Sequence, residues 1–240
     1  MLNFIKQIIN AIIPPRCLVC SKTVNFDNHL CAECFEKITF ITTPYCKHCG
    51  TPFARTVSDG EKFCIHCLDE KNKDNIRISR SAVVYDEFSK KIILDFKFLD
   101  HIENKKLMAN WLNMASSDIF NLGVDLIIPV PLHFIRILSR KYNQSAILAD
   151  ELAKIRKIDV AFDCLKKTKR TLPQVMCSGA ERKKNIKGAF KVYNIQKIKG
   201  KRILLIDDVY TTGSTLKECA KVLIKAGAKS VDTLTVAKVC

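Results

Sequence analysis

The chain lacks any apolar run near the ~20 residues that a membrane-spanning helix needs, and nothing in it indicates export. It is also short of acidic residues, with 24 Asp and Glu against 40 Lys and Arg, a formal net charge of +16. The imbalance is local: residues 132–202 hold 19 basic and 5 acidic residues, whereas residues 1–75 hold 9 and 8. Such a field attracts polyanions, either nucleotides or nucleic acid. AT-rich coding would explain the abundance of lysine but not its uneven placement.

The first 13 residues have the spacing of a short amphipathic helix. Lys6 interrupts the apolar residues and no small-residue cleavage site follows, so the segment differs from a signal peptide. We predict a docking helix over residues 1–13, ended by Pro14 and Pro15; the alternative is a peripheral membrane contact. Its apolar face holds Ile5, Ile8, Ile9, Ile12 and Ile13. With no span and no leader, we expect a cytoplasmic protein.

Eight of the 12 cysteines form four Cys-x-x-Cys pairs. Each pair presents two thiolates from one tight turn, and two pairs complete a tetrahedral zinc site. The spacing favours sequential pairing into two sites, although an interleaved pairing is also compatible with it. The predicted sets are Cys17, Cys20, Cys31 and Cys34, and Cys46, Cys49, Cys64 and Cys67.

We call the four Cys-x-x-Cys pairs the cysteine ladder. Disulfides are the competing interpretation of this pattern, and they would need an oxidising compartment. We predict Zn²⁺ with a structural role, because four thiolates leave no open position for catalysis. A region of about 60 residues with few aliphatics needs metal binding to fold. The nearby histidines are expected to be bystanders rather than ligands, and the remaining cysteines to be free thiols. These are His29, His48 and His66, and Cys164, Cys177, Cys219 and Cys240.

The rest of the chain, after a polar linker at residues 69–75, alternates strand and helix patterns. Strands with two apolar faces between helices predict an α/β fold with a doubly wound parallel sheet and helices on both faces. We therefore expect a ribbon domain over residues 14–75 and a sheet domain over 76–240. The predicted strands span 81–85, 125–131, 201–206 and 230–237; the predicted helices span 87–98, 107–120, 134–157 and 214–226.

One segment joins an apolar strand, two carboxylates and a hydroxyl-rich loop that opens a helix. Residues 203–206 are apolar, Asp207 and Asp208 follow, and Gly213 lets a ligand approach the backbone closely. Backbone N–H groups at a helix N-terminus cradle anions. Carboxylates at the carboxyl end of the strand accept hydrogen bonds from a ribose diol. The ligand implied is a sugar phosphate.

This segment resembles the 5-phosphoribosyl-1-pyrophosphate (PRPP) motif of type I phosphoribosyltransferases. The resemblance implies that Asp207 and Asp208 bind the ribose 2′ and 3′ hydroxyls and that residues 211–215 bind the 5′-phosphate, with Mg²⁺ accompanying PRPP. The implied PRPP-binding set is Asp207, Asp208, Val209, Thr211, Thr212, Gly213, Ser214 and Thr215.

Further segments match a narrower family. They are Tyr85-Asp86 with Lys97-Phe98, Pro129-Val130-Pro131-Leu132, Arg140-Lys141-Tyr142-Asn143-Gln144, and Arg182 with Asn185 and Gly188-Ala189-Phe190. With the cysteine ladder and the phosphate loop, they resemble the ComF family, which joins a double zinc ribbon to a phosphoribosyltransferase domain and is associated with competence for DNA uptake. The family usually has glycine where this chain has Lys141.

Five residues are assigned to the pyrophosphate or acceptor side of the site, by resemblance and because arginine binds phosphate bidentately. For the arginines on the predicted helix, exposed surface charge is the alternative. The five are Arg136, Arg140, Asn143, Gln144 and Arg182. The basic residues 166–191 have three interpretations: a lid over the acceptor, a nucleic-acid contact or a solvated surface. Few aromatic residues lie there for base stacking.

Two functions follow. The first, from the resemblance and the basic stretch 132–202, is a PRPP-binding protein that handles incoming single-stranded DNA during transformation, with PRPP, single-stranded DNA and other DNA-uptake proteins as partners. The second is an active phosphoribosyltransferase of nucleobase metabolism, a pentosyl-transferring glycosyltransferase that uses PRPP and Mg²⁺. No residue is assigned as general base. A purely structural zinc adaptor is a third hypothesis.

Overall fold

A computed structural model describes residues 14–53, 63–69, 74–98, 104–132, 142–169 and 186–240. The predicted helix at residues 1–13 and the predicted site residues Arg136, Arg140 and Arg182 lie outside the described residues, as does most of the basic stretch 166–191. Within the described ranges, no helix has the length and apolar character needed to cross a membrane.

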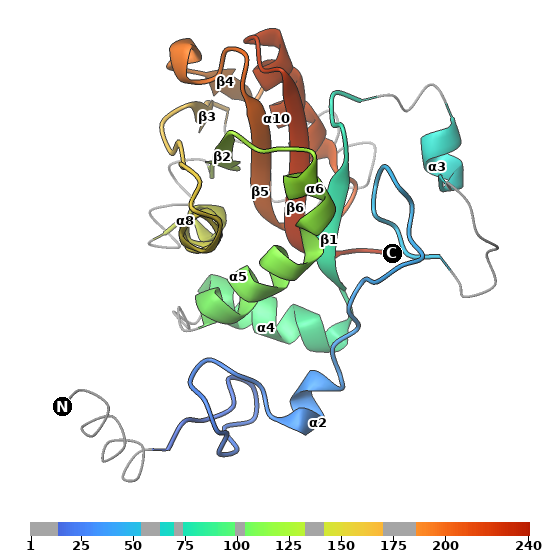
Figure 1. The fold of residues 1–240 in the computed structure, drawn as a ribbon, viewed down its shortest axis with the longest axis vertical. Helices are drawn as coiled ribbons and strands as arrows, with labels where there is room; N and C mark the ends of the chain where they lie inside the picture. Colours follow the sequence, from blue (N-terminus) through green and yellow to red (C-terminus); the bar gives the residue numbers. More distant parts are fainter. Residues whose placement is uncertain (1–13, 54–62, 70–73, 99–103, 133–141, 170–185) are drawn as a thin grey trace.

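A four-stranded parallel sheet forms the centre of the molecule (Figure 1). Its strand order is β1-β6-β5-β2, and a separate two-stranded antiparallel sheet pairs β3 with β4. The strands are β1 (Ser79–Val84), β2 (Leu126–Pro129), β3 (Leu165–Lys167), β4 (Phe190–Val192), β5 (Arg202–Tyr210) and β6 (Ser230–Lys238). The helices are α2 (Ala32–Phe35), α3 (Ile65–Leu68), α4 (Glu87–Phe98), α5 (Asn104–Ala115), α6 (Ser117–Asn121), α8 (Gln144–Arg156), the 3₁₀ helix η3 (Ile195–Lys197) and α10 (Ser214–Lys225).

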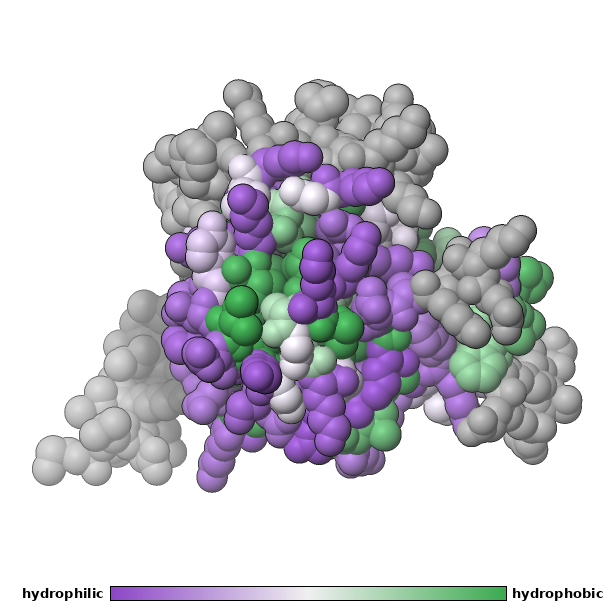
Figure 2. Space-filling model, turned by 90° about the horizontal axis from the view of Figure 1, so that it is seen from above, coloured by the Kyte–Doolittle hydropathy of each residue, from purple (hydrophilic) through white to green (hydrophobic). Residues whose placement is uncertain are grey.

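Strand β5 shows why the sheet is covered on both faces. Leu204 and Ile206 join a buried cluster with side chains of α4, α5 and α8, whereas Ile203 and Leu205 join a second cluster with α10 and β4. Successive side chains of a strand point to opposite faces, so an unbroken apolar run needs two layers of cover. Figure 2 views the molecule from above relative to Figure 1. On the surface seen there, hydrophobic residues lie in the middle and hydrophilic residues lie around them. The predicted α/β fold class is confirmed.

Three predicted elements have different limits in the structure. The helix expected over residues 107–120 is two helices, because Ser116 Oγ donates to the Asn113 carbonyl oxygen and interrupts the helix. The continuous helix expected over 134–157 is wrong: Tyr142 and Asn143 are not helical, and α8 begins at Gln144. The strand expected to end at Ile206 continues to Tyr210, because its pairing with β6 extends to Tyr210 opposite Lys238.

The segment before the sheet holds the cysteine ladder in two separate ribbons. We call the ribbon at residues 14–35 the first ribbon and the ribbon at 44–69 the second ribbon. The first ribbon contributes Leu18, Val19 and Leu30 to the cluster that contains α4 and α5, and it lies on the α4 side of the molecule in Figure 1. The second ribbon lies beside β1, where Ser79 N donates to the His48 carbonyl oxygen over 2.7 Å.

Candidate functional site: an anion loop and two cysteine tetrads

The predicted phosphate loop connects β5 to α10. Gly213 precedes the helix with φ of +69°, a left-handed conformation that favours glycine. A Cβ at this position would collide with the phenol ring of Tyr210, which packs directly against Gly213. The N-cap residue Gly213 has no side chain that could cap this 12-residue helix, and the Ser214 backbone N–H makes only a long contact of 3.5 Å with Thr212 Oγ1. The Thr212 and Ser214 hydroxyls lie 2.9 Å apart at the start of the helix. The loop therefore has the geometry of an anion-binding helix N-terminus.

Asp207 is held by two donors near the end of β5. Ser145 Oγ, from the first turn of α8, donates to Asp207 Oδ1 over 2.9 Å, and the Asp208 backbone N–H donates to the same oxygen over 2.9 Å. Burial, with the neighbouring Asp208 carboxylate, raises the pKa of Asp207 to about 7. The raised pKa favours the protonated form of Asp207 more than in an exposed aspartate, whereas the ionised form can accept hydrogen bonds from two hydroxyl groups.

Asp208 has a cationic partner that comes from a distant helix. Lys97 Nζ, near the end of α4, lies 2.8 Å from Asp208 Oδ2, and both side chains are largely buried. The carbonyl of Lys97 accepts a hydrogen bond from Gln144 Nε2, and the carbonyl of Phe96 accepts one from the Tyr142 hydroxyl. The end of α4 is therefore fixed against the start of α8, with its ammonium group directed at the carboxylate pair.

Asn143 and Gln144, which we assigned to the acceptor side, make protein contacts at the same edge of the sheet. Asn143 Oδ1 accepts from the Ser145 backbone N–H and caps α8, and Asn143 Nδ2 donates to the Val130 carbonyl at the end of β2. Gln144 is 1% exposed. Their direct contact with a ligand stays a prediction. No role was predicted for Ser145, Lys97 or Tyr210, although Lys97 and Tyr210 both lie in segments that carry the family resemblance.

The eight ladder cysteines form two groups, each with four sulfur atoms within 4.8 Å of one another. The sets are Cys17, Cys20, Cys31 and Cys34, and Cys46, Cys49, Cys64 and Cys67. Zn–S bonds of about 2.3 Å in a tetrahedron place sulfurs just under ~4 Å apart, and the Cys49 and Cys64 sulfurs are 3.5 Å apart. The backbone N–H of Cys64 points at Cys46 Sγ over 3.3 Å, as a thiolate requires. Both tetrads fit Zn²⁺, and their cysteines are grouped in the sequential sets that the spacing favours.

None of the three nearby histidines belongs to a tetrad among the described residues. His48 is nevertheless close to the metal position of the second ribbon. Its Nδ1 lies 3.4 Å from Cys67 Sγ, while its Nε2 lies 3.0 Å from the Ile76 carbonyl oxygen. Gly50 completes the same turn with φ of +67°, and a Cβ there would meet the Ser79 carbonyl oxygen at 2.7 Å. The second ribbon is thus fitted closely against β1.

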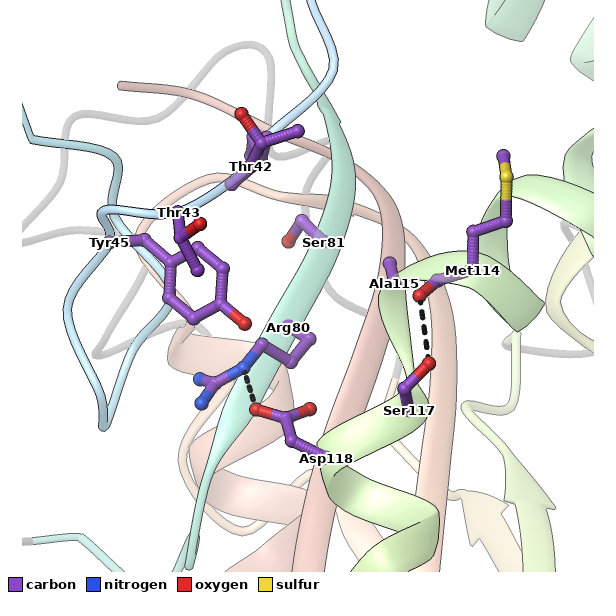
Figure 3. Close-up of a pocket in the computed structure, with 10 residues that line it drawn as sticks. Thr42, Thr43, Tyr45, Arg80, Ser81, Met114, Ala115, Ser117 and Asp118 are labelled. Carbon is purple, nitrogen blue, oxygen red and sulfur yellow. Dashed lines mark hydrogen bonds and ion pairs between the residues drawn. The ribbon is translucent and has the colours of Figure 1, made fainter.

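A cavity of about 230 Å³ lies between the chain around residues 41–45, β1 and the α5–α6 junction (Figure 3). Its charged groups are Arg80 and Asp118, which pair with each other: Arg80 Nε donates to Asp118 Oδ2 over 2.6 Å, and the Arg80 guanidinium lies 4.8 Å from the centre of the Tyr45 ring. The remaining guanidinium nitrogens donate to the carbonyls of Lys47, His48 and Ser79. Because every guanidinium nitrogen has a protein acceptor, the cavity offers an anion far less than the loop at residues 211–215 does.

Comparison with known proteins places this architecture in a class. The protein-family model of the double zinc ribbon domain matches residues 8–69, and the protein-family model of the phosphoribosyl transferase domain matches residues 128–239. The chain therefore joins a double zinc ribbon to a phosphoribosyltransferase-type domain.

Relatives that match most of the chain define a narrower family within this class. Competence protein F of Haemophilus influenzae is 31% identical over 230 residues, covering 93% of this chain and 96% of that protein. Competence protein ComFC of Bacillus subtilis is 28% identical over 87% of this chain and 84% of its own length. DNA utilization protein YhgH of Escherichia coli K12 is 27% identical over 90% and 87%. The chain belongs to the ComF family, as its sequence motifs predicted.

Proposed function

We propose that this protein binds PRPP at residues 207–215 and uses that site while handling DNA that enters the cell. The observation that supports the ligand is that two carboxylates lie just ahead of a hydroxyl-rich loop and a helix N-terminus whose N-cap residue is glycine. Asp207 and Asp208 suit a ribose diol, and the first turn of α10 suits the 5′-phosphate. The role in handling DNA is supported by the relatives, which are named competence and DNA utilization proteins.

Lys97 adds a reason to expect a polyanionic ligand. Asp207 and Asp208 are adjacent carboxylates, and the Lys97 ammonium offsets part of their charge. The hydroxyls of a sugar diol can donate to these carboxylates in place of the Lys97 ammonium, and the pyrophosphate of the same molecule attracts the freed ammonium group. Mg²⁺ is expected to arrive with PRPP and to offset charge on its pyrophosphate.

Binding of PRPP with Mg²⁺ can be measured by isothermal titration calorimetry. We expect Asp208→Asn to weaken binding at least about tenfold, because a hydrogen bond to a charged group contributes about 1.5–3 kcal/mol. The matched control is Asp150→Asn, which removes an exposed carboxylate from α8 that pairs with Lys154. Equal binding by all three proteins, or no binding by the wild type, would remove PRPP from the proposal.

The DNA part of the proposal has support on the β3–β4 sheet. Lys166 and Lys191 are directly opposite each other in its antiparallel register and both are exposed. Like charges in that position destabilise a strand pair, and a bound phosphate backbone would relieve this. Lys166 Nζ also lies 4.9 Å from the centre of the Tyr193 ring, and this ring is 41% exposed. A lysine pair beside an exposed aromatic ring is suited to single strands.

Fluorescence anisotropy with labelled single-stranded DNA at several salt concentrations tests this surface. Lys166→Ala with Lys191→Ala should weaken binding and reduce the salt slope by about 0.7 for each phosphate that the protein no longer neutralises. Lys106→Ala with Lys221→Ala is the control, because it removes two lysines from the helices α5 and α10, outside the β3–β4 sheet. A salt slope that the first pair leaves unchanged would contradict a phosphate contact at β3–β4.

Catalysis is the second candidate, favoured by the position of the Asp207 and Asp208 carboxylates directly ahead of the loop that opens α10. In such a transfer, an acceptor nitrogen forms a bond to C1′ of PRPP as the bond to the pyrophosphate oxygen breaks. Pyrophosphate leaves with the electron pair, and the acceptor proton goes to a base. Release of pyrophosphate in the presence of PRPP, Mg²⁺ and a panel of nucleobases would establish it, and no turnover with any acceptor would leave PRPP binding without transfer.

A further inference from the structure

Tyr210 and Lys238 join the phosphate loop to the second ribbon. They are register partners on β5 and β6, and Lys238 Nζ lies 3.7 Å from the centre of the Tyr210 ring. On one side, the Tyr210 phenol packs directly against Gly213 of the loop. On the other, Lys238 Nζ donates to the carbonyl oxygen of Cys49 over 3.2 Å. The turn that carries a predicted metal ligand is therefore two side chains away from the loop.

A second connection reaches the other end of the loop. Asp74 Oδ2 lies 3.1 Å from Lys217 Nζ, and Asp74 Oδ1 lies 3.7 Å from His48 Nε2. Lys217 is in the first turn of α10, and its backbone N–H donates to the Gly213 carbonyl oxygen over 2.9 Å. Asp74 is 11% exposed and Lys217 is 38% exposed, so water screens this ion pair only in part.

The turn between Cys46 and Cys49 is itself firmly attached to the sheet. Arg80, 6% exposed on β1, donates to the Lys47 carbonyl over 2.9 Å and to Asp118 of α6 (Figure 3). The Ser79 backbone N–H donates to the His48 carbonyl over 2.7 Å. A turn held in this way transmits its position to whatever contacts it.

The first ribbon has different neighbours. Its apolar side chains pack into the cluster on the α4 and α5 face, whereas Leu216 of α10 belongs to the cluster on the opposite face. Lys37, which follows it, lies over the ring of Phe88 in α4 at 5.8 Å. The described contacts of the first ribbon thus lead to α4 and α5, and those of the second ribbon lead to β5, β6 and α10.

We propose that the second ribbon is a positioning element for the phosphate loop, acting through Tyr210, Lys238 and Asp74, so that PRPP affinity depends on an intact second tetrad far more than on an intact first one. The inference rests on the proposed PRPP site. It assigns the metal a task beyond folding the ribbon: a filled tetrad fixes the Cys49 carbonyl and His48, which in turn fix both ends of the loop.

Two variants break the connections without removing a cysteine. Lys238→Met removes the ammonium group but keeps an apolar chain over the Tyr210 ring, and Asp74→Asn removes the charge that holds Lys217. Lys22→Met is the control, because it removes a lysine from the first ribbon, where Lys22 pairs with Glu33. Zinc content, measured by mass spectrometry, should stay at two per chain in all three variants.

Calorimetry should then show PRPP binding about five- to tenfold weaker for Lys238→Met and Asp74→Asn, as expected when one largely buried charged group no longer holds its partner, and unchanged for Lys22→Met. Hydrogen–deuterium exchange gives a second readout that needs no ligand. The amides of residues 210–217 should exchange faster in Lys238→Met and Asp74→Asn than in the wild type and Lys22→Met.

The two readouts separate the two proposals. If the wild type fails to bind PRPP, the proposed ligand is wrong, and the exchange experiment still tests the connection. If exchange over residues 210–217 is the same in all four proteins, the second ribbon does not position the loop and the inference is overturned. Faster exchange with unchanged PRPP affinity would also overturn it, since the position of the loop would then be irrelevant to binding.

Discussion

The two cysteine tetrads have the same ligands and the same sequential pairing, yet they have different surroundings. In the first, Cys20 is exposed and the neighbouring Lys22–Glu33 pair lies in solvent. In the second, Cys46 is fully buried, and the turn that follows it contacts Arg80, Ser79 and Lys238. Identical metal chemistry can therefore serve only the stability of a ribbon in one place and also the geometry of a distant site in another.

The largest difference between the two ribbons is expected when one cysteine ligand is removed from each tetrad in turn. Cys17→Ser and Cys46→Ser should each abolish zinc at one site and unfold that ribbon, since structural zinc contributes ~10–16 kcal/mol of folding free energy. Only Cys46→Ser should also abolish PRPP binding. Zinc content, circular dichroism and calorimetry measure these effects. Loss of PRPP binding in both variants would mean that the ribbons support the site equally.

The next largest effect concerns Arg80, which has no equivalent among the described contacts of the first ribbon. Arg80→Met should lower the free energy of unfolding by about 3–5 kcal/mol, because it leaves the carbonyls of Lys47 and His48 and the Asp118 carboxylate without their buried partner. Urea denaturation provides the measurement. Arg16→Met, in the first ribbon, is the control and should leave the urea midpoint unchanged; an equal decrease in both would remove the distinction.

Asp207 tests the site that the second ribbon is proposed to support. Its pKa in the folded protein, about 7, lies above its usual value of 3.8. The folded state therefore resists ionisation, and this group lowers the free energy of unfolding as the pH rises from about 4 to about 7. Asp207→Asn keeps an oxygen that accepts from Ser145 Oγ and the Asp208 N–H, but it never ionises.

The asparagine variant should therefore match the wild type near pH 4 and exceed it by roughly 2–3 kcal/mol above pH 7, a discounted conversion of the pKa shift because the side chain is only half-buried. Any zinc loss at low pH affects both proteins alike and cancels in the difference. Denaturation at a series of pH values measures it. A stability difference that does not grow with pH would mean that Asp207 is not held in a protonation-favouring environment.

Some features of the molecule could be predicted from the sequence, whereas others depend on contacts between distant segments. Both tetrads followed from the Cys-x-x-Cys spacing, and the buried strand at residues 203–206 followed from its unbroken apolar run. Local signals suffice for such features. The start of α8 also has a local signal, because Asn143 is a strong N-cap residue, but the helical spacing of the residues on both sides of it favours one continuous helix.

The contacts that complete the site could not be predicted in this way. Ser145 and Asp207 are 62 residues apart, and Lys97 reaches Asp208 from another helix. Tyr210 meets Lys238 because β5 and β6 pair in one particular register, and the sequence pattern leaves that register open. The same holds for the difference between the ribbons: spacing makes them look alike, and only tertiary packing decides which one lies beside the loop.

We expect almost no effect on stability from removing the ion pair beside the metal position of the first ribbon. Lys22 and Glu33 form an ion pair at 2.6 Å, and the pKa of Glu33 is lowered by this contact, yet both side chains are more than half exposed. Water and salt screen such a pair, so Lys22→Met should leave the melting temperature and zinc content unchanged. Differential scanning calorimetry at low and physiological salt measures this. A clear decrease in melting temperature would show that the first ribbon, like the second, depends on side chains around its metal position.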